Sequence, residues 1–403
     1  MSQNSSVAAE RRRDATTDGR VPMAIYCTYF GIDSHLRTTT ICALTPEDGE
    51  LRTRTFRGND YGEMAEWMAD FPQPSHGVYE SGCTGFVPAR MLTRGDTLVE
   101  PVASSKLPSS ADSRSRKNDR RDAERLARLA LAGEVSPVWV PPEQVEGLRE
   151  LAQAMDDLAC VREAARQRVN AILCRHGISW DERTPTGRLK KRWGQHFWNW
   201  LRSIDLGDAG SQAAYLAALS AAESAEVAYD ELRARAEGIA RASDLGPVID
   251  ALMCVKGVGF SSALAFAAEV GDFSRFASGR KVTSYFGLAP SESSSAESRR
   301  LGRISRNGCA LVRKLLVEGA WVLARGNPAC RKRGGASVPL AIREHARACS
   351  GRLLGRRREL VSRGLMPCKA NTATAAEMAR MLLYIGRDAQ EAAALAAEVA
   401  LVA

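Results

Sequence analysis

Four carboxylate residues occupy positions suited to holding divalent metal ions: Asp33, Glu80, Asp119 and Asp122. Asp33 and Glu80 each close an apolar run that predicts a buried β-strand. Asp119 and Asp122 stand at the entry to an apolar-periodic helix and, three residues apart, share one of its faces. Two strand ends and one helix face are suitable places from which carboxylates can bind a pair of Mg²⁺ (or Mn²⁺) ions beside a phosphodiester. The sequence therefore predicts a metal-dependent nuclease centre.

The elements that must position these residues alternate between strand and helix. After the strand that ends at Asp33, the predicted elements are hairpin strands over residues 38–44 and 51–56, an amphipathic stretch over 60–71, the strand that ends at Glu80, a helix over 87–93 and a strand over 97–103. Taken singly, each carboxylate is better explained as a cap or turn former. The ordered set instead favours a ribonuclease H-like core of the α/β class over residues 21–140.

Composition points to a polyanionic partner. The chain has 403 residues, 56 Lys and Arg against 47 Asp and Glu, and a net charge of +9. That length allows two or three domains, and a basic balance supports nucleic-acid binding only weakly. No stretch approaches the ~20 apolar residues of a membrane span, so no membrane partner is expected.

Cysteine usage and the amino terminus indicate a cytoplasmic protein. The ten cysteines are scattered without a CxxC pair, which argues against a zinc site and against a disulfide framework. Residues 1–20 are polar and charged with no apolar core, so they predict a disordered arm rather than a secretory signal.

A helical region is expected over residues 141–245. Pro141 and Pro142 mark its start, and apolar residues recur at helical spacing over 145–176. A second helical stretch covers 213–242, so a helical hairpin or coiled coil is predicted. Its use would be assembly into a homodimer or homotetramer; a monomeric helical spacer is the alternative.

The segment between those helices, residues 177–206, is rich in tryptophan and in cations. Trp193 and Trp198 alternate with residues such as Lys191 and Arg192. Aromatic faces stack on unpaired bases while cations hold the backbone, so Trp193 is a candidate RNA contact. A small hydrophobic cluster capping the hairpin is an equally good interpretation.

The remaining chain, residues 246–403, opens with a glycine-containing turn and a serine cluster. Lys256, Gly257 and Gly259 resemble a helix-hairpin-helix turn, in which backbone N–H groups approach a DNA phosphate. Three serines end at Ser295, and basic residues that include Arg300 and Arg303 follow them. From composition alone, a loop rich in Ser and Glu explains this cluster.

Six motifs in order give the chain a recognisable identity. They are Gly-Ile-Asp33, Tyr-Glu80-Ser-Gly, Lys-Asn-Asp119-Arg-Arg-Asp122, Lys-Gly-Val-Gly259, Phe-Gly-Leu-Ala-Pro290 with the serine cluster, and Gly302-Arg-Ile-Ser-Arg-Asn-Gly308. Together they resemble the DEDD-type transposases of bacterial insertion sequences, which recombine DNA through a serine and are guided by a bridging non-coding RNA. The resemblance covers roughly residues 24–323; the tail beyond Arg325 is expected to be a basic C-terminal extension.

The resemblance implies a RuvC-like nuclease domain, a helical hairpin and a mainly helical, serine-bearing transposase domain. It implies Mg²⁺ or Mn²⁺ at the acidic quartet and double-stranded DNA and a guide RNA as partners, in a bacterial, nucleoid-associated protein. It also implies a nucleophilic serine five residues after Pro290, which is Ser295. The family pattern has glycine next, whereas this chain has Ala296, so Ser294 stays an alternative. Lys117 and Arg120, beside the acidic pair, and Arg300 and Arg303 are candidate nucleic-acid contacts.

Two other functions use the same residues differently. A structure-specific endonuclease, such as a junction resolvase, would use the carboxylates with water as the nucleophile. An RNA-binding scaffold would need neither the carboxylates nor Ser295.

A serine hydroxyl is a weak nucleophile at neutral pH and needs a neighbouring base or metal. No histidine accompanies the cluster, so a metal held by the quartet is the natural activator.

Overall fold

The chain forms two compact units, which divide after Pro141. The structure is a computed structural model that describes residues 26–108, 118–295, 298–324 and 338–402, without the side chains of 292–301 and 400–402. The predicted arm over residues 1–20 and the candidate contact Lys117 lie outside the described residues.

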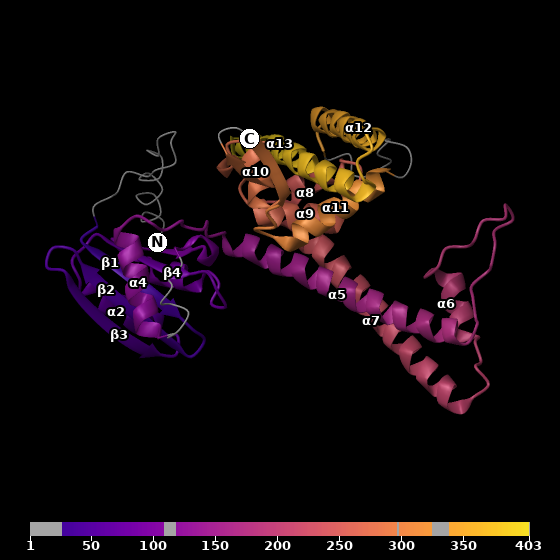
Figure 1. Cartoon of the computed structure of the whole chain (residues 1–403), viewed down its shortest axis with the longest axis horizontal. Helices are drawn as coiled ribbons and strands as arrows, with labels where there is room; N and C mark the ends of the chain where they lie inside the picture. Colours follow the sequence, from indigo (N-terminus) through magenta and orange to yellow (C-terminus); the bar gives the residue numbers. More distant parts are fainter. Residues whose placement is uncertain (1–25, 109–117, 296–297, 325–337, 403) are drawn as a thin grey trace. The chain divides into compact units, whose positions relative to one another are not determined.

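The first unit is built on a five-stranded mixed sheet (Figure 1). Its strands are β1 (Thr28–Ser34), β2 (Thr38–Thr45), β3 (Glu50–Arg57), β4 (Ser75–Glu80) and β5 (Thr97–Val102). They lie in the order β3-β2-β1-β4-β5. The first three strands pair antiparallel, whereas β4 pairs parallel with both β1 and β5. The strands predicted from the sequence are confirmed, and the mixed sheet is consistent with a RuvC-like core.

Helices cover both faces of this sheet. Phe30 and Ile32 of β1 pack with residues of α2 (Tyr61–Ala69) and α3 (Val87–Leu92). Tyr29 packs on the other face with Leu126 of α4 (Asp119–Leu131). Because successive side chains of a strand alternate between faces, the residues two and four positions after Tyr29 also face α4. The sheet thus presents Gly31 and Asp33 to the helix that carries the acidic pair.

Gly31 permits α4 to lie directly on β1. A Cβ atom at Gly31 would stand 1.9 Å from the carbonyl oxygen of Ala123 and 2.4 Å from the nitrogen of Ala127. Asn118 caps the start of this helix, and its Oδ1 accepts a hydrogen bond from the backbone N–H of Arg120 at 3.1 Å. Such a cap fixes the first turn of a helix. Strand and helix together therefore determine where Asp119 and Asp122 stand.

The second unit opens with the predicted helical hairpin. Its long helices are α5 (Glu143–Arg175) and α7 (Ala209–Ala242), and α6 (Gln195–Arg202) lies in the segment between them. Arg166 of α5 donates two hydrogen bonds to Glu226 of α7, while Leu173, further along α5, packs with Tyr215, near the start of α7. The two helices are therefore antiparallel and pack along their length (Figure 1).

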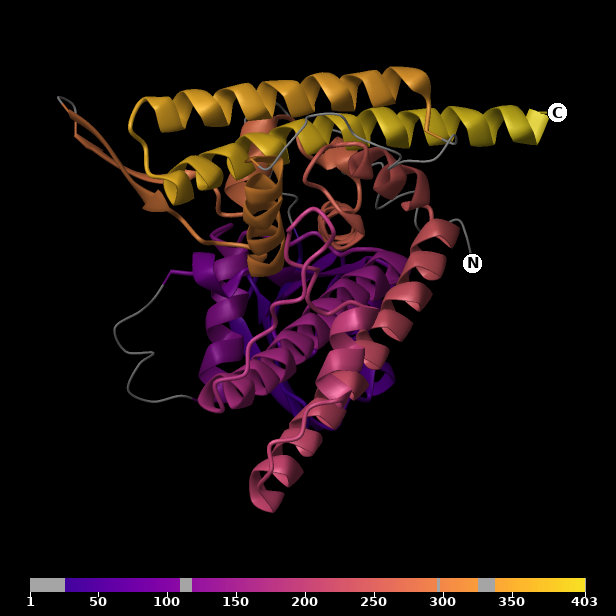
Figure 2. The ribbon, with the colours of Figure 1, turned by 90° about the vertical axis from the view of Figure 1, so that its right-hand side faces the viewer.

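The remaining elements of this unit form a mainly helical body. They are α8 (Gly246–Met253), α9 (Phe260–Val270), a 3-10 turn (Phe273–Arg275), α10 (Gly279–Tyr285), β6 (Pro290–Ser295), β7 (Ser298–Ile304), α11 (Ala310–Ala324), α12 (Leu340–Ser362) and α13 (Pro367–Val402). Figure 2 shows α12 and α13 lying side by side. None of the helices in the described ranges is long and apolar enough to span a bilayer.

The C-terminal segment is part of the core rather than an extension. Helix α13 packs against α8, α10, α11 and α12. Its side chains at Met378, Leu382 and Ile385 have no exposed surface. The sequence predicted a basic C-terminal extension here, and the basic residues of the stretch lie mainly on α12. There, Arg343 and Arg347 are exposed while the opposite side of the helix is buried.

Replacing Gly31 by alanine should loosen α4 on the sheet, because the new methyl group would overlap the helix backbone. Overpacking of this kind costs about 1–3 kcal/mol, so hydrogen–deuterium exchange in the full chain should rise in β1 and α4. Gly147→Ala in α5 is the control, since its Cβ would meet open space and alanine is the better helix former. Unchanged exchange in β1 and α4 would contradict the close contact.

Candidate functional site

Asp33 and Glu80 end neighbouring parallel strands. Ile32 of β1 is opposite Tyr79 of β4, so the residues that follow them lie at adjacent strand ends. Carboxyl ends of parallel strands form the edge of an open sheet at which ligands commonly bind. The side chain of Asp33 is 17% exposed, whereas Glu80 is exposed. Both carboxylates are thus at one edge of the sheet, as predicted.

Helix α4 brings the acidic pair into the electric field of Asp33. Burial raises the pKa of Asp33 above its ordinary value; the positive charge of a protonated His35 would lower it, and the negative charges of Asp119 and Asp122 raise it. Negative charges that crowd in this way repel one another. The arrangement therefore favours a bound cation.

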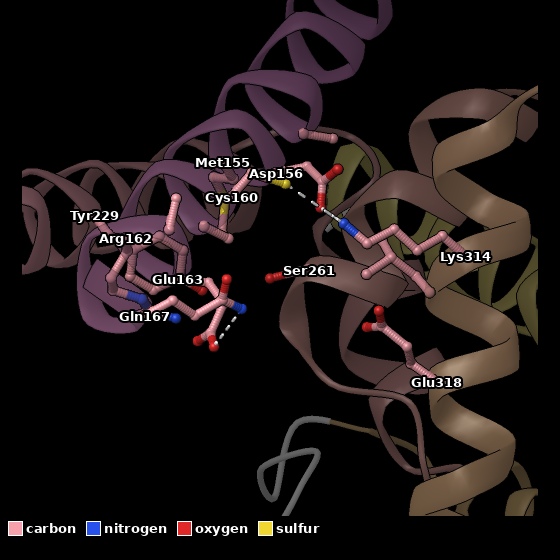
Figure 3. A pocket seen from close by; sticks show the side chains of 14 residues that line it. Met155, Asp156, Cys160, Arg162, Glu163, Gln167, Tyr229, Ser261, Lys314 and Glu318 are labelled. Atoms are coloured by element: carbon pink, nitrogen blue, oxygen red, sulfur yellow. Dashed lines mark hydrogen bonds and ion pairs between the residues drawn. The ribbon is translucent and has the colours of Figure 1, made fainter. Parts of the chain in front are cut away.

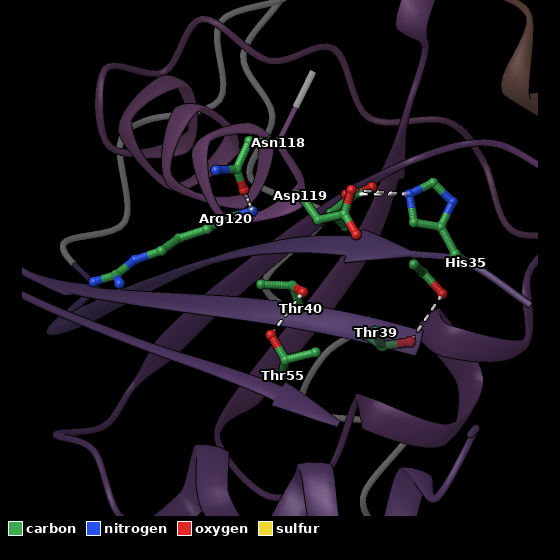
Figure 4. A network of polar contacts seen from close by, with 9 residues as sticks. His35, Thr39, Thr40, Thr55, Asn118, Asp119 and Arg120 are labelled. Atoms are coloured by element: carbon green, nitrogen blue, oxygen red, sulfur yellow. Dashed lines mark hydrogen bonds and ion pairs between the residues drawn. The ribbon is translucent and has the colours of Figure 1, made fainter. Parts of the chain in front are cut away.

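A histidine that the sequence analysis missed completes the cluster. The Nε2 atom of His35 lies 3.2 Å from Oδ2 of Asp33 and 3.9 Å from Oδ1 of Asp119 (Figure 4). The three donor atoms all lie within 4.8 Å of one another and suit a metal ion. The available signal was the spacing Asp33-Ser-His35 at the end of a strand, two residues apart and hence on one side.

The four predicted carboxylates are not equally close to this cluster. Asp33 and Asp119 belong to the three-donor group, and Asp122 is near enough to affect the pKa of Asp33. Glu80 lies at the adjacent strand end, but its carboxylate is not one of the donors in that group. Arg120, predicted as a nucleic-acid contact, is exposed and points away from Asp119 (Figure 4).

The predicted serine lies in a β-hairpin of the second unit. Ser295 is the last residue of β6 and pairs with Ser298, the first of β7. The two residues between them lie outside the described ranges. The strand pairing includes Ser294 with Arg299 and Ser293 with Arg300. Arginines are therefore opposite the serine run in the backbone pairing; the composition had suggested only a loop.

Arg303 is the basic residue of this hairpin whose side chain is described. It is exposed, and its carbonyl oxygen accepts a hydrogen bond from Oγ of Ser291 at 3.0 Å. The side chains of Ser294, Ser295 and Arg300 are not among those described.

The glycine-containing turn is held by packing. Gly257 has a φ of +92°, and a Cβ there would lie 2.4 Å from the carbonyl oxygen of Gly319 in α11. The backbone N–H of Lys256 donates to Oγ of Ser350 in α12 at 3.0 Å. Gly259, at the start of α9, has open space around its Cβ position. The contact with α11 explains why residue 257 is a glycine. Phosphate binding at this turn stays a prediction, and it concerns chiefly Gly259 and the N-terminus of α9.

The tryptophans between α5 and α7 pack against one another. Trp180 and Trp198 are 5% and 9% exposed, and Trp193 contacts the rings of Phe197 and Trp198 edge to face. Arg166 of α5 stacks over Trp193 at 4.9 Å. For Trp180 and Trp198 the structure favours the hydrophobic cluster over base stacking, while Trp193 is partly exposed.

A basic cavity of about 480 Å³ lies beside this cluster. The cations in its lining are Arg188, Lys190 and Lys191, and none of its lining residues is acidic. Lys190 is paired with Glu182 at 2.8 Å. Gly194, where α6 begins without a side-chain cap, contributes to one wall. Cations and uncapped helix N–H groups together attract phosphate, so the segment is a candidate contact for the sugar–phosphate backbone of a nucleic acid.

A different cavity, of about 570 Å³, lies among α5, α7, α9 and α11 (Figure 3). Nζ of Lys314 donates to Oδ1 of Asp156 at 2.7 Å, and this hydrogen bond raises the pKa of Lys314. Arg162 stacks over Tyr229 at 3.6 Å. Charges of both signs line the space, so its electrostatics do not select one class of ligand.

Asp33→Asn should stabilise the metal-free protein at neutral pH. The raised pKa means that the folded state binds a proton more tightly than the unfolded state, so ionised Asp33 destabilises the fold as pH rises through that pKa. Thermal melting in EDTA should show the variant above wild type at pH 7, with the difference shrinking as pH falls below the raised pKa. A difference in melting temperature that stays constant with pH would contradict the raised pKa of Asp33.

Comparisons with known proteins agree with this geometry. Residues 30–177 match a transposase model of the DEDD type, and residues 249–334 match the model described as Transposase IS116/IS110/IS902 family. The putative transposase y4qE of Sinorhizobium fredii is 33% identical, with 93% of this chain and 92% of that protein aligned.

Two transposases named for their insertion sequences are also similar. The transposase of IS1533 from Leptospira borgpetersenii is 26% identical over 63% of this chain and 72% of its own length. The transposase of IS1111A from Coxiella burnetii is 28% identical over 53% of this chain and 56% of its own length. An acidic cluster at the edge of a mixed sheet, both family models and a full-length relative lead to one conclusion: the chain belongs to the IS116/IS110/IS902 family of transposases.

Proposed function

We propose that this transposase cuts and rejoins DNA by forming a transient bond between Ser295 and a DNA phosphate, at a centre served by a metal-binding acidic quartet. The observation that supports it most is the convergence of Asp33 and Asp119, with Asp122 close by, at the sheet edge. The proposal explains why a transposase of this family would maintain partly buried, mutually repelling carboxylates.

The residues present fit a divalent cation. The cluster offers carboxylate oxygens and is raised in energy by like charges when empty of cations. A divalent ion held by Asp33, Glu80, Asp119 and Asp122 would polarise the phosphodiester and neutralise developing charge. The chain's own contribution is to hold these groups in position through the contact of α4 with β1.

The serine step conserves the energy of the broken bond. Ser295 loses its hydroxyl proton, its Oγ bonds to phosphorus, and the bond from that phosphorus to one deoxyribose oxygen breaks. The freed oxygen takes up a proton and becomes a hydroxyl group. In the reverse step, a hydroxyl from another strand attacks the phosphoserine and releases the serine. Strands can therefore be exchanged without an external energy source.

A junction-resolving endonuclease is the second candidate function. Its support is that, among the described residues, the three donors that could hold a metal ion all lie in the first unit. Water would then be the nucleophile, and the serine hairpin would only contact DNA.

Ser295→Ala and Asp122→Asn separate these functions in one assay with full-length protein, DNA and Mg²⁺. Transposition through serine predicts that both variants lose strand exchange, and that a denaturant-trapped protein–DNA adduct maps to Ser295 by mass spectrometry. Ser294→Ala is the matched control and should retain the adduct. An adduct on Ser294 would move the nucleophile by one residue. Cleavage by Ser295→Ala with no adduct on the serine cluster would return the protein to the resolvase function.

We also propose a non-coding guide RNA as a partner, held in part by the basic cavity of residues 184–196. Its three cations and its uncapped helix start support contact with phosphates rather than with stacked bases. Assembly into a homodimer or homotetramer would supply enough sites for two duplexes. Exposed Val161, Val227 and Ile239 on the hairpin are candidate contacts between copies.

Reversing two charges of the cavity, Arg188→Glu with Lys191→Glu, should weaken RNA binding. Loss of two phosphate contacts lowers the slope of log affinity against log salt by about 1.4, at about 0.7 per contact for a single strand. Arg233→Glu with Arg235→Glu, towards the other end of α7, is the control with the same change of net charge. Filter binding over a salt series measures both pairs. Equal slopes for the two pairs would remove the cavity from the RNA site.

A further inference from the structure

His35 is held close to the two carboxylates by the chain around it. It directly follows β1, and its backbone N–H donates to the carbonyl oxygen of Thr38 at 2.9 Å, which closes the turn into β2. The ring is 40% exposed, and its Nε2 atom is within 4 Å of a carboxylate oxygen of both Asp33 and Asp119. The turn and the α4–β1 contact thus place an imidazole beside two acids that belong to different elements.

The spacing of His35 from each of the two carboxylates is that of ligands around an ion. Two donors each about 2.1 Å from an ion lie about 3.0 Å apart at a right angle and about 4.2 Å apart when opposite. The Nε2 atom of His35 lies 3.2 Å from Asp33 and 3.9 Å from Asp119, within that range. Such distances let one ion replace the direct histidine–carboxylate contacts with only small movements.

We propose that His35 is a nitrogen ligand of the metal centre, so that the centre binds first-row transition ions more tightly than Mg²⁺. Imidazole nitrogen binds such ions well, whereas Mg²⁺ prefers oxygen. This inference rests on the metal-binding role proposed for Asp33 and Asp119, and it adds a ligand and a class of ion that the acidic quartet alone does not specify.

The competing explanation is a structural ion pair, in which a charged His35 only offsets two acids. The chain contains a second histidine–aspartate pair that can be compared with this one. Nδ1 of His345 lies 3.0 Å from Oδ2 of Asp388, and the side chain of His345 is also 40% exposed. Among the described residues, that pair is not part of a metal-binding group. His345→Gln is therefore a matched control, since it removes a similarly exposed histidine–aspartate contact without removing a proposed ligand.

The test is pulsed electron paramagnetic resonance of the full chain loaded with Mn²⁺. Wild type should show nitrogen coupling to the ion, which changes when histidine is labelled with ¹⁵N and disappears in His35→Gln. The affinity for Mn²⁺, measured by calorimetry, should fall at least about tenfold in His35→Gln, since even partners of metal ligands are worth 10–100-fold. The affinity for Mg²⁺ should change much less. His345→Gln should match wild type in every measurement.

The outcomes separate this inference from the function on which it rests. If Asp33→Asn abolishes Mn²⁺ binding but wild type shows no nitrogen coupling, His35 is an ion-pair partner and the carboxylate site stands. If Asp33→Asn binds Mn²⁺ as wild type does, the metal centre itself is misplaced and both proposals fail. Nitrogen coupling that persists in His35→Gln would assign the ligand to another histidine and overturn this proposal.

Discussion

The first unit depends on the contact between the backbone of α4 and the middle of β1. Gly31 makes it possible, because any side chain there would overlap Ala123 and Ala127. The same contact brings Asp119 and Asp122 over the strand that carries Asp33. The missing Cβ atom of Gly31 thus allows α4 to pack on β1 and, through that packing, brings Asp119 and Asp122 close to Asp33. Mutual repulsion raises the free energy of the cation-free site, and the packing of the helix on the sheet must overcome it.

Most elements were predictable because their signals are local. Strand alternation, apolar runs and the double proline at 141–142 gave the five strands and the long hairpin helices nearly to their ends. Helix α13 was missed because its burial depends on four other helices, and charge in the preceding segment obscured its apolar content. The β6–β7 hairpin was missed because a run of serines has little strand signal of its own.

The positions of the candidate acids could be predicted from the sequence, whereas the position of His35 could not. The positions of Asp33 and Glu80 followed from parallel strand ends, which sequence patterns reveal. The contribution of His35 depends on the turn after β1 and on α4 together, which no local pattern specifies. The tryptophans were ambiguous because aromatic residues beside cations suit both a core and a base-stacking surface. Burial of Trp180 and Trp198 decides that question only in three dimensions.

Gly257 and Gly319 form a reciprocal contact, in which a Cβ on either residue would meet the carbonyl oxygen of the other, at 2.4 and 2.7 Å. Since the obstacle is backbone in both directions, a change at one position cannot compensate for a side chain at the other. We therefore expect each of the two glycines to be retained for its own steric reason, without covariation between the two positions. Invariance of Gly257 among relatives would therefore record the packing of α11 and would not by itself distinguish a DNA-binding turn from a structural one.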